Sequence, residues 1–164
     1  MKEILLQYAQ YNAWANKLII DVMLTVTDEQ LDMPISSSFP SIRATAYHTW
    51  GAEAIWLQRL QLAEHSTWAP DTFTGTFAAA CADWQKASAA VISFIEKQYN
   101  DQAMTHVVEF RDRQGKAHKQ KTSYILQHVF NHATYHRGQL VTMLRQVGVT
   151  TIPSTDLIYF VQKK

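Results

Sequence analysis

The sequence TSYILQHVFNHATYHRGQLVTMLRQVG, which spans residues 122–148, decides the fold class of this protein. Its apolar and histidine side chains recur at a regular spacing, at Ile125, Val129, His132, His136, Leu140 and Met143. This spacing matches the 3.6 residues of a helical turn, so the segment predicts a long amphipathic helix. Gly148 follows the last apolar positions and can adopt the left-handed conformation that ends many helices.

Three further long helices are predicted upstream of this segment. The prolines lie at positions 34, 40, 70 and 153 and leave long intervals in which a helix can run unbroken. The apolar patterns predict helices over residues 2–24, 41–63 and 74–97. In the first of them we expect a buried stripe made of Ile4, Tyr8, Tyr11, Ala15, Leu18 and Val22, with Leu5, Asn12 and Ile19 beside it. Four helices of similar length predict an all-α fold, a four-helix bundle.

The connections between these helices carry their own signals. Thr27 and Gln30 fit the capping-box pattern and predict a short turn after the first helix. Residues 104–121 lose the helical period and predict a small β-hairpin between the third and fourth long helices, because two alternating runs flank the polar stretch RDRQGK. The hairpin segment holds the basic residues Arg111, Arg113, Lys116, Lys119 and Lys121 against Glu109 and Asp112, a composition typical of a solvated hairpin. The tail LIYFV after Pro153 predicts a last turn that packs back onto the bundle.

Composition and charge exclude several functional classes. The chain has 164 residues, of which 47% are hydrophobic and 18% charged, and this predicts one globular domain over residues 1–164. A formal net charge of +1 leaves no surplus of positive charge for a nucleic-acid backbone or an anionic membrane. The apolar runs are far shorter than the roughly 20 residues that cross a bilayer, and the N-terminus lacks a signal-peptide pattern. We therefore expect a cytoplasmic protein that binds neither nucleic acid nor membrane.

The single cysteine, Cys81, restricts the metal chemistry that is available. One cysteine cannot form an internal disulfide or a thiolate zinc cage. Its place in an apolar helical stripe predicts a buried structural thiol rather than a nucleophile. Any metal site must therefore use histidines and carboxylates.

Three of the seven histidines lie on one helix and point to a metal site. His128, His132 and His136 recur every four residues, so we expect them to share the inward face of the helix. Buried ring nitrogens need partners, and one metal ion satisfies several of them at once. The spacing of His132 and His136 lets both rings reach one cation, and His48 on the second predicted helix can supply a third ligand. We interpret the remaining histidines, His65, His106 and His118, as solvated or locally hydrogen-bonded.

Two familiar metal motifs are absent from the sequence. A zincin helix needs a glutamate directly after its first histidine, and Ala133 occupies that position. A carboxylate-bridged di-iron bundle needs a glutamate three residues before each ligand histidine. The corresponding positions hold Val129, Ala133 and Thr45. The sequence therefore fits neither of these two classes of metal site.

Several segments together resemble the DinB family of metal-dependent four-helix proteins, which includes the YfiT-like enzymes. They are the run FNHATYHRGQLVTMLRQVG followed by Pro153 and Asp156, the segment SIRATAYHTWGAEAIWLQRL and the opening YNAWAN. The resemblance covers almost the whole chain, and its most specific element is the histidine pair followed by Arg-Gly-Gln. It implies that His48, His132 and His136 hold one divalent metal ion, zinc or nickel. It also implies a core role, or a role beside the ligands, for His128.

Five other residues match family-like positions, and we expect a structural role for each: Asn12, Trp14, Asn16, Glu53 and Arg137. The asparagines are expected to bond to a helix backbone, and the tryptophan is expected to fill the core. Glu53 and Arg137 are expected to form an ion pair between helices.

The resemblance leaves three functions open. The first is a metal-dependent enzyme that uses a metal-activated thiol or water on a small molecule, as a thiol S-transferase or a hydrolase; relatives transfer low-molecular-weight thiols such as bacillithiol or mycothiol. The second is a metal-binding protein without catalysis. The third is a stress- or DNA-damage-associated interaction protein. We also expect a homodimer, because Trp14, Trp50, Trp56, Trp68 and Trp84 exceed what one bundle core readily buries and because relatives are often dimers.

Overall fold

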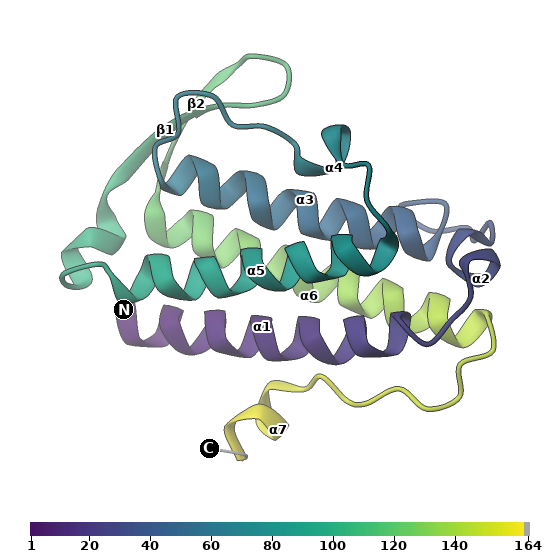
Figure 1. Cartoon of the computed structure of the whole chain (residues 1–164). Helices are drawn as coiled ribbons and strands as arrows, with labels where there is room; N and C mark the ends of the chain where they lie inside the picture. The colour runs from purple at the N-terminus through teal and green to yellow at the C-terminus, as the bar shows by residue number, and fades with distance from the viewer. Residues whose placement is uncertain (163–164) are drawn as a thin grey trace.

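The computed structural model describes residues 1–162, and its body is a bundle of four long helices (Figure 1). The four helices are α1 (Lys2–Met23), α3 (Ile42–Leu60), α5 (Phe77–Glu96) and α6 (Thr122–Gln146). Both α1 and α3 pack against α5 and α6, so α1 and α3 occupy opposite corners of the bundle. The all-α four-helix bundle predicted from the periodicity is confirmed.

The helix ends differ from the predicted bounds by a few residues because of local capping. The hydroxyls of Ser41 and Thr76 accept hydrogen bonds from the backbone N–H groups of Ala44 and Ala79, both at 3.2 Å. Both residues are therefore N-caps with extended backbone, and the helices begin one residue after them. Helix α3 ends at Leu60, three residues before the predicted end, and Leu62 has a left-handed φ of 58° that breaks the helical path.

Three short helices lie outside the bundle. Helix α2 (Asp28–Asp32) begins at the predicted capping box, in which Thr27 and Gln30 bond reciprocally. Helix α4 (Ala69–Thr72) lies in the connection between α3 and α5, and its proline occupies the first turn, where the missing N–H costs nothing. Helix α7 (Leu157–Gln162) packs back onto α1 through Phe160, as the tail pattern predicted.

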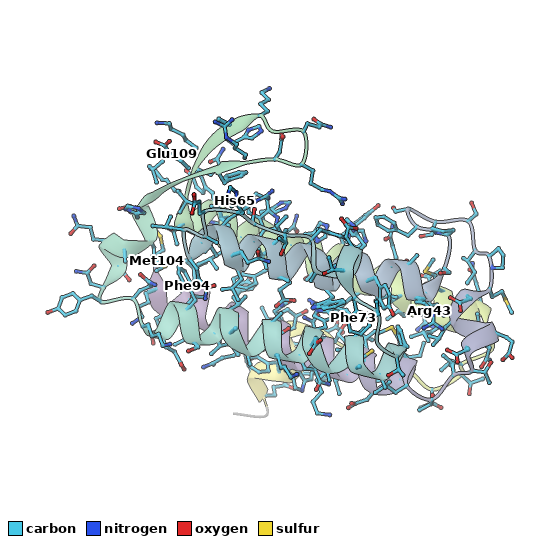
Figure 2. The ribbon with its side chains drawn as sticks, turned by 45° about the horizontal axis from the view of Figure 1, so that its top comes forward. Arg43, His65, Phe73, Phe94, Met104 and Glu109 are labelled. Atoms are coloured by element: carbon cyan, nitrogen blue, oxygen red, sulfur yellow. The ribbon has the colours of Figure 1, made fainter. Side chains whose placement is uncertain are left out.

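The predicted hairpin is present between α5 and α6. After a 3₁₀ turn, η1 (Asp101–Thr105), strand β1 (Val107–Arg111) pairs in antiparallel register with β2 (Ala117–Lys121). Gly115 adopts φ 83° in the connecting turn, a conformation that favours glycine. Figure 2 shows the ribbon of the hairpin, with Glu109 labelled, standing out from the helices. Because α6 starts directly after β2, the base of the hairpin is fixed to the bundle.

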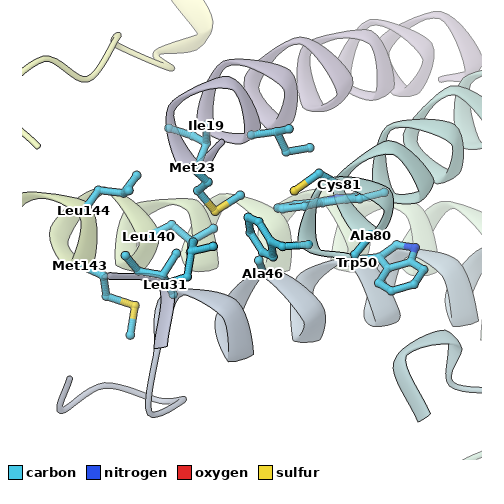
Figure 3. Close-up of a cluster of buried hydrophobic side chains, with 14 of the residues drawn as sticks. Ile19, Met23, Leu31, Ala46, Trp50, Ala80, Cys81, Leu140, Met143 and Leu144 are labelled. Atoms are coloured by element: carbon cyan, nitrogen blue, oxygen red, sulfur yellow. The ribbon is translucent and has the colours of Figure 1, made fainter. Parts of the chain in front are cut away.

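Two large apolar clusters lie in the core, one toward each end of the bundle, and a third, small cluster joins Tyr11 and Ala15 of α1 to Phe160 of α7. Figure 3 shows the first, where Met23 of α1 and Leu140 of α6 meet Ala46 of α3 and Cys81 of α5. The second cluster draws on the other halves of the same helices: Leu5, Leu57, Val91, Ile125, Leu126 and Val129 are among its members. Within residues 1–162, no helix combines the length and the apolar character that a bilayer crossing requires.

The buried face of α1 differs from the predicted stripe. Ile4 and Tyr8 are 60% and 40% exposed, whereas Asn12 and Asn16 are almost completely buried. The prediction was wrong for Ile4 and Tyr8, whereas Asn12, expected beside the stripe, is buried. The buried face of α1 is thus turned toward Asn12 and Asn16, and both asparagines enter a polar layer between the two large apolar clusters.

Candidate metal centre

The three histidines singled out as metal ligands meet between α3 and α6. His48 comes from α3, and His132 and His136 come from successive turns of α6. The Nε2 atom of His132 lies 3.0 Å from Nε2 of His48 and 3.1 Å from Nε2 of His136. One ring nitrogen from each residue lies within 4.8 Å of the other two.

Hydrogen bonds between neutral imidazoles cannot satisfy this arrangement. His136 Nδ1 lies 2.7 Å from Oε1 of Gln139 and donates to it, so Nε2 of a neutral His136 carries a lone pair. If His132 Nε2 donates its hydrogen to that lone pair, it has no lone pair left to accept a hydrogen bond from His48. The contact between His48 and His132 is then left without a full hydrogen bond, which is costly in a partly buried site.

Protonation of a histidine would supply the missing hydrogen, but it is unfavourable at this site. Burial lowers the pKa of His48 to about 4, and the nearby His136 and Arg113 lower it further in the same direction. Burial also lowers the pKa of His132 to about 3, with contributions from its histidine neighbours. Burial likewise lowers the pKa of His136, against the hydrogen bond to Gln139 that raises it. All three rings are therefore neutral near pH 7.

The donor set fits a single metal ion. Imidazole nitrogens bound to one cation at about 2.0–2.1 Å lie roughly 3.0–3.4 Å apart in octahedral or tetrahedral geometry. The two short nitrogen–nitrogen distances at His132 agree with this spacing. A cation would also give every facing lone pair a partner without a proton. The cluster can therefore hold a metal ion.

Aromatic rings cover the cluster from the connection before α3. Phe39 stacks on His48, with ring centroids 4.1 Å apart, and also approaches His136 at 5.7 Å. This connection is tied to α6, because Gln139 Nε2 donates to Ser38 Oγ at 2.7 Å. Gln139 thus bonds a histidine of the cluster with one end of its amide and the covering segment with the other. The sequence signal for this role was limited to the position of Gln139 in the Arg-Gly-Gln run.

A second aromatic wall comes from the segment before α4. Trp68 lies against His48, with ring centroids 5.6 Å apart. Gly51 on α3 makes room for it, because a Cβ atom there would lie 2.6 Å from the indole. Sequence reasoning did not connect Trp68 with the site, since the contact joins a loop to a helix turn across the fold.

His128 does not join the cluster, and the expectation that it points inward was wrong. Its side chain is exposed, with its ring 5.6 Å from that of His132 and 5.2 Å from that of Trp56. Four residues advance a helix by about 40° more than one full turn, so three histidines at this spacing drift around the axis. His132 and His136 face α3, and His128 has already turned toward solvent.

The other histidines lie apart from the cluster, as predicted. His118 on β2 bonds Asp112 at 2.8 Å and stacks on Phe110. His65 and His106 are exposed. Figure 2 shows His65 between the hairpin and the helices.

A buried polar network begins at Arg137, the residue that follows His136 on α6. Arg137 Nη1 donates to the side-chain oxygens of Asn12 and Asn16, at 2.6 and 2.8 Å. The amide nitrogens of the same asparagines donate to the two carboxylate oxygens of Glu53, both at 3.1 Å. Trp84 Nε1 adds a third donor to Glu53 at 3.0 Å. The expected ion pair between Glu53 and Arg137 is thus bridged by asparagines, and these bond to side chains rather than to a helix backbone.

Two further expectations concern Cys81 and Trp14. Cys81 is buried in the first apolar cluster, and burial raises the pKa of its thiol to about 12, which fits a structural thiol. Trp14 does not fill the bundle core. It is half-buried on the outer side of α1 and packs against Phe160 of α7.

The bundle and the three-histidine cluster together define a helical protein with a candidate metal site. The DinB family model matches residues 1–163, and the chain belongs to the DinB family.

Known proteins of the same kind match over most of their length. Protein DinB of Bacillus subtilis is 25% identical over 171 aligned residues, which cover 100% of this chain and 98% of that protein. The uncharacterized protein YrdA of the same organism is 28% identical and covers 77% of this chain and 72% of its own length. Crystal structures of DinB-like proteins from Bacillus cereus and Bacillus subtilis share the fold. Their TM-scores are 0.72 and 0.68 and their identities 23% and 14%; they cover 93% and 92% of this chain, and this chain covers 95% and 97% of theirs.

Proposed function

We propose that the protein binds one divalent metal ion, zinc or nickel, through His48, His132 and His136, and that it is a metal-dependent enzyme acting on a small molecule. The observation that carries the proposal is the convergence of three ring nitrogens that neutral hydrogen bonding cannot satisfy. When bound, an ion held by three neutral imidazoles offers an open coordination position and favours the anionic form of a thiol or water molecule. The reaction that we propose is transfer of a low-molecular-weight thiol to an electrophile.

The surrounding side chains support a positioning role around this site. Gln139 accepts a hydrogen bond from His136 Nδ1 and so directs Nε2 of that ring toward the cluster. Phe39 and Trp68 cover two sides of His48 and limit the access of water. Cys81 is remote from this role because its thiol is buried and protonated, so we propose that no protein side chain forms a covalent intermediate.

Elemental analysis tests the metal. The protein should be purified without a histidine tag, and we expect one divalent ion per chain. A chelator should lower the Tm of the metal-loaded protein, because a ligand that binds only the folded state stabilises it. An absence of bound metal, together with a Tm that zinc and nickel leave unchanged, would overturn the proposal.

Cobalt substitution tests the nucleophile. A thiol that coordinates cobalt adds an intense sulfur-to-metal charge-transfer band in the near ultraviolet. We expect this band with at least one of bacillithiol, mycothiol, glutathione and cysteine, followed by transfer to a suitable electrophile. If all four leave the spectrum unchanged, water becomes the nucleophile to test, with a panel of esters, amides and lactones. Inactivity in both panels would leave a metal-binding protein without catalysis.

A further inference from the structure

The hairpin carries five basic residues, and Arg113 is distinguished by its contacts. Lys119 pairs with Glu109 across the hairpin, and Arg111 donates to the carbonyl of Gly115 in its turn. Arg113 instead reaches away from the hairpin. Its Nη2 atom pairs with Asp71 of α4 at 3.2 Å, and its guanidinium lies 5.1 Å from the centre of the Trp68 ring.

Trp68 connects this guanidinium with the candidate metal centre. The indole lies between Arg113 and His48, at 5.1 Å from the guanidinium and 5.6 Å from the imidazole. Its position is determined by close packing, since even a methyl group on Gly51 would collide with it. The positive charge of Arg113 is also felt at the cluster, where it contributes to the lowered pKa of His48.

The charges around Trp68 and His48 favour an anion. The cluster itself consists of neutral histidines, so a bound divalent ion would keep its full positive charge. Arg113 adds a second positive charge on the same side as His48. Its acidic partner Asp71 is 60% exposed, and ion pairs between exposed groups are weak, so a ligand anion can take its place.

We propose that Arg113 and Trp68 form a carboxylate-binding subsite for a small molecule whose other end reaches the metal. The inference rests on the proposed function, because the metal anchors the ligand beside Arg113. An anchored ligand presents its carboxylate at a high effective concentration, which compensates for the exposure of the guanidinium. The planar guanidinium can bind a carboxylate through two hydrogen bonds. The cation–π contact with the Trp68 ring holds the guanidinium in place.

Matched thiol ligands test this subsite on the cobalt-loaded protein. A series of unbranched ω-mercaptocarboxylates of increasing length is titrated, each against the mercaptoalcohol of the same length, and the charge-transfer band gives the Kd. We expect the acid to bind about three- to fivefold more tightly than the alcohol at the chain length that reaches Arg113. The preference should shrink as the ionic strength rises.

Three variants separate the subsite from general effects of charge and folding. Arg113→Gln should abolish the preference for the acid, whereas cobalt should still bind and the alcohol should keep a Kd close to that of the wild type. Lys116→Gln, which removes an exposed charge from the same hairpin, should keep the preference. Asp71→Asn should increase it, because the competing carboxylate is gone. If the Arg113–Asp71 pair has only a structural role, Asp71→Asn should instead lose the preference for the acid, as Arg113→Gln does.

Two results would overturn the inference while leaving the proposed function standing: cobalt binding with equal affinities for acid and alcohol at every length, or a preference that survives in Arg113→Gln. If cobalt does not bind at all, the proposed function fails, and the subsite that depends on it fails too.

Discussion

The Nε2 atoms of His48 and His132 lie 3.0 Å apart although the residues are separated by 84 positions in the sequence. Each belongs to a different long helix, so the contact exists only because α3 packs directly against α6. The candidate metal centre therefore depends on the packing of α3 against α6. Substitutions of the histidines should change metal binding without changing the helices.

Substitution of His136 by alanine should lower metal occupancy by at least about tenfold, because it removes one of three proposed ligands. The helical content should survive, since the helices are held together by the two large apolar clusters, which do not include the three histidines. Elemental analysis and far-ultraviolet circular dichroism measure the two quantities. His128→Ala is the matched control on the same helix and should keep its metal. Full occupancy in the His136 variant would show that the ligand assignment is wrong.

Substitution of Gln139 by alanine should weaken metal binding by about 10- to 100-fold, the usual effect of losing a hydrogen-bond partner of a ligand histidine. The reason is its 2.7 Å bond to His136 Nδ1, which sets the orientation of the ring. Competition with a chromophoric chelator gives the affinity. Gln139→Glu keeps an acceptor at the same place and should restore binding, whereas equal affinities for the alanine variant and the wild type would exclude the orienting role.

The metal-free protein should lose stability as the pH falls from about 6.5 toward about 4. The folded-state pKa values of His48 and His132 are lowered to about 4 and about 3, below the value near 6.5 of an unfolded histidine. The unfolded chain therefore binds more protons in this range, and acid favours unfolding. Urea denaturation at pH 7 and pH 5 measures the loss.

A variant with both His48 and His132 replaced by glutamine serves as the control for that titration. Its stability should change less between pH 7 and pH 5 than that of the wild type, because glutamine does not titrate. Equal changes in the two proteins would assign the pH dependence to other groups.

Replacing Arg137 by methionine should lower the free energy of unfolding by about 3 to 5 kcal/mol, as expected when one charge of a buried pair is removed. Both Asn12 and Asn16 would lose the donor to their side-chain oxygens, and Glu53, whose pKa is raised by burial, would lose the positive charge of Arg137 that favours its ionised form. Urea denaturation of the metal-free protein measures the effect. Arg145→Met removes an exposed arginine from the same helix and should cost far less; a similar cost for both would show that the network adds little.

The homodimer remains a prediction, but its basis has changed. The five tryptophans are all buried or half-buried within the chain, so they no longer argue for a partner. The structure offers a different reason, an apolar face on which Ile4 and Tyr8 of α1 lie exposed next to Phe130 of α6. Light scattering should give twice the 18.8 kDa of one chain at micromolar concentration. Ile4→Lys should then dissociate the dimer, and a monomeric wild-type protein would disprove it.

The local features of this protein follow from its sequence alone. Helical periodicity predicted the four long helices, Thr27 and Gln30 predicted the short turn after the first of them, and the alternating runs around Gly115 predicted the hairpin. These signals act over a few residues through backbone hydrogen bonds and side-chain spacing, so they need no knowledge of the partner elements. The same spacing, together with the family resemblance, singled out His48, His132 and His136.

Only the tertiary structure decided which faces of the helices meet. Asn12 and Asn16 are buried because Glu53 and Arg137 from two other helices complete their hydrogen bonds, and the apolar periodicity of α1 contains no information about these partners. The placement of Phe39, Trp68 and Arg113 around His48 likewise depends on loops that cross the bundle. His128 was excluded from the cluster by the angle that each helical step adds. Local sequence determines which elements form, and the packing of distant segments determines which side chains they bring together.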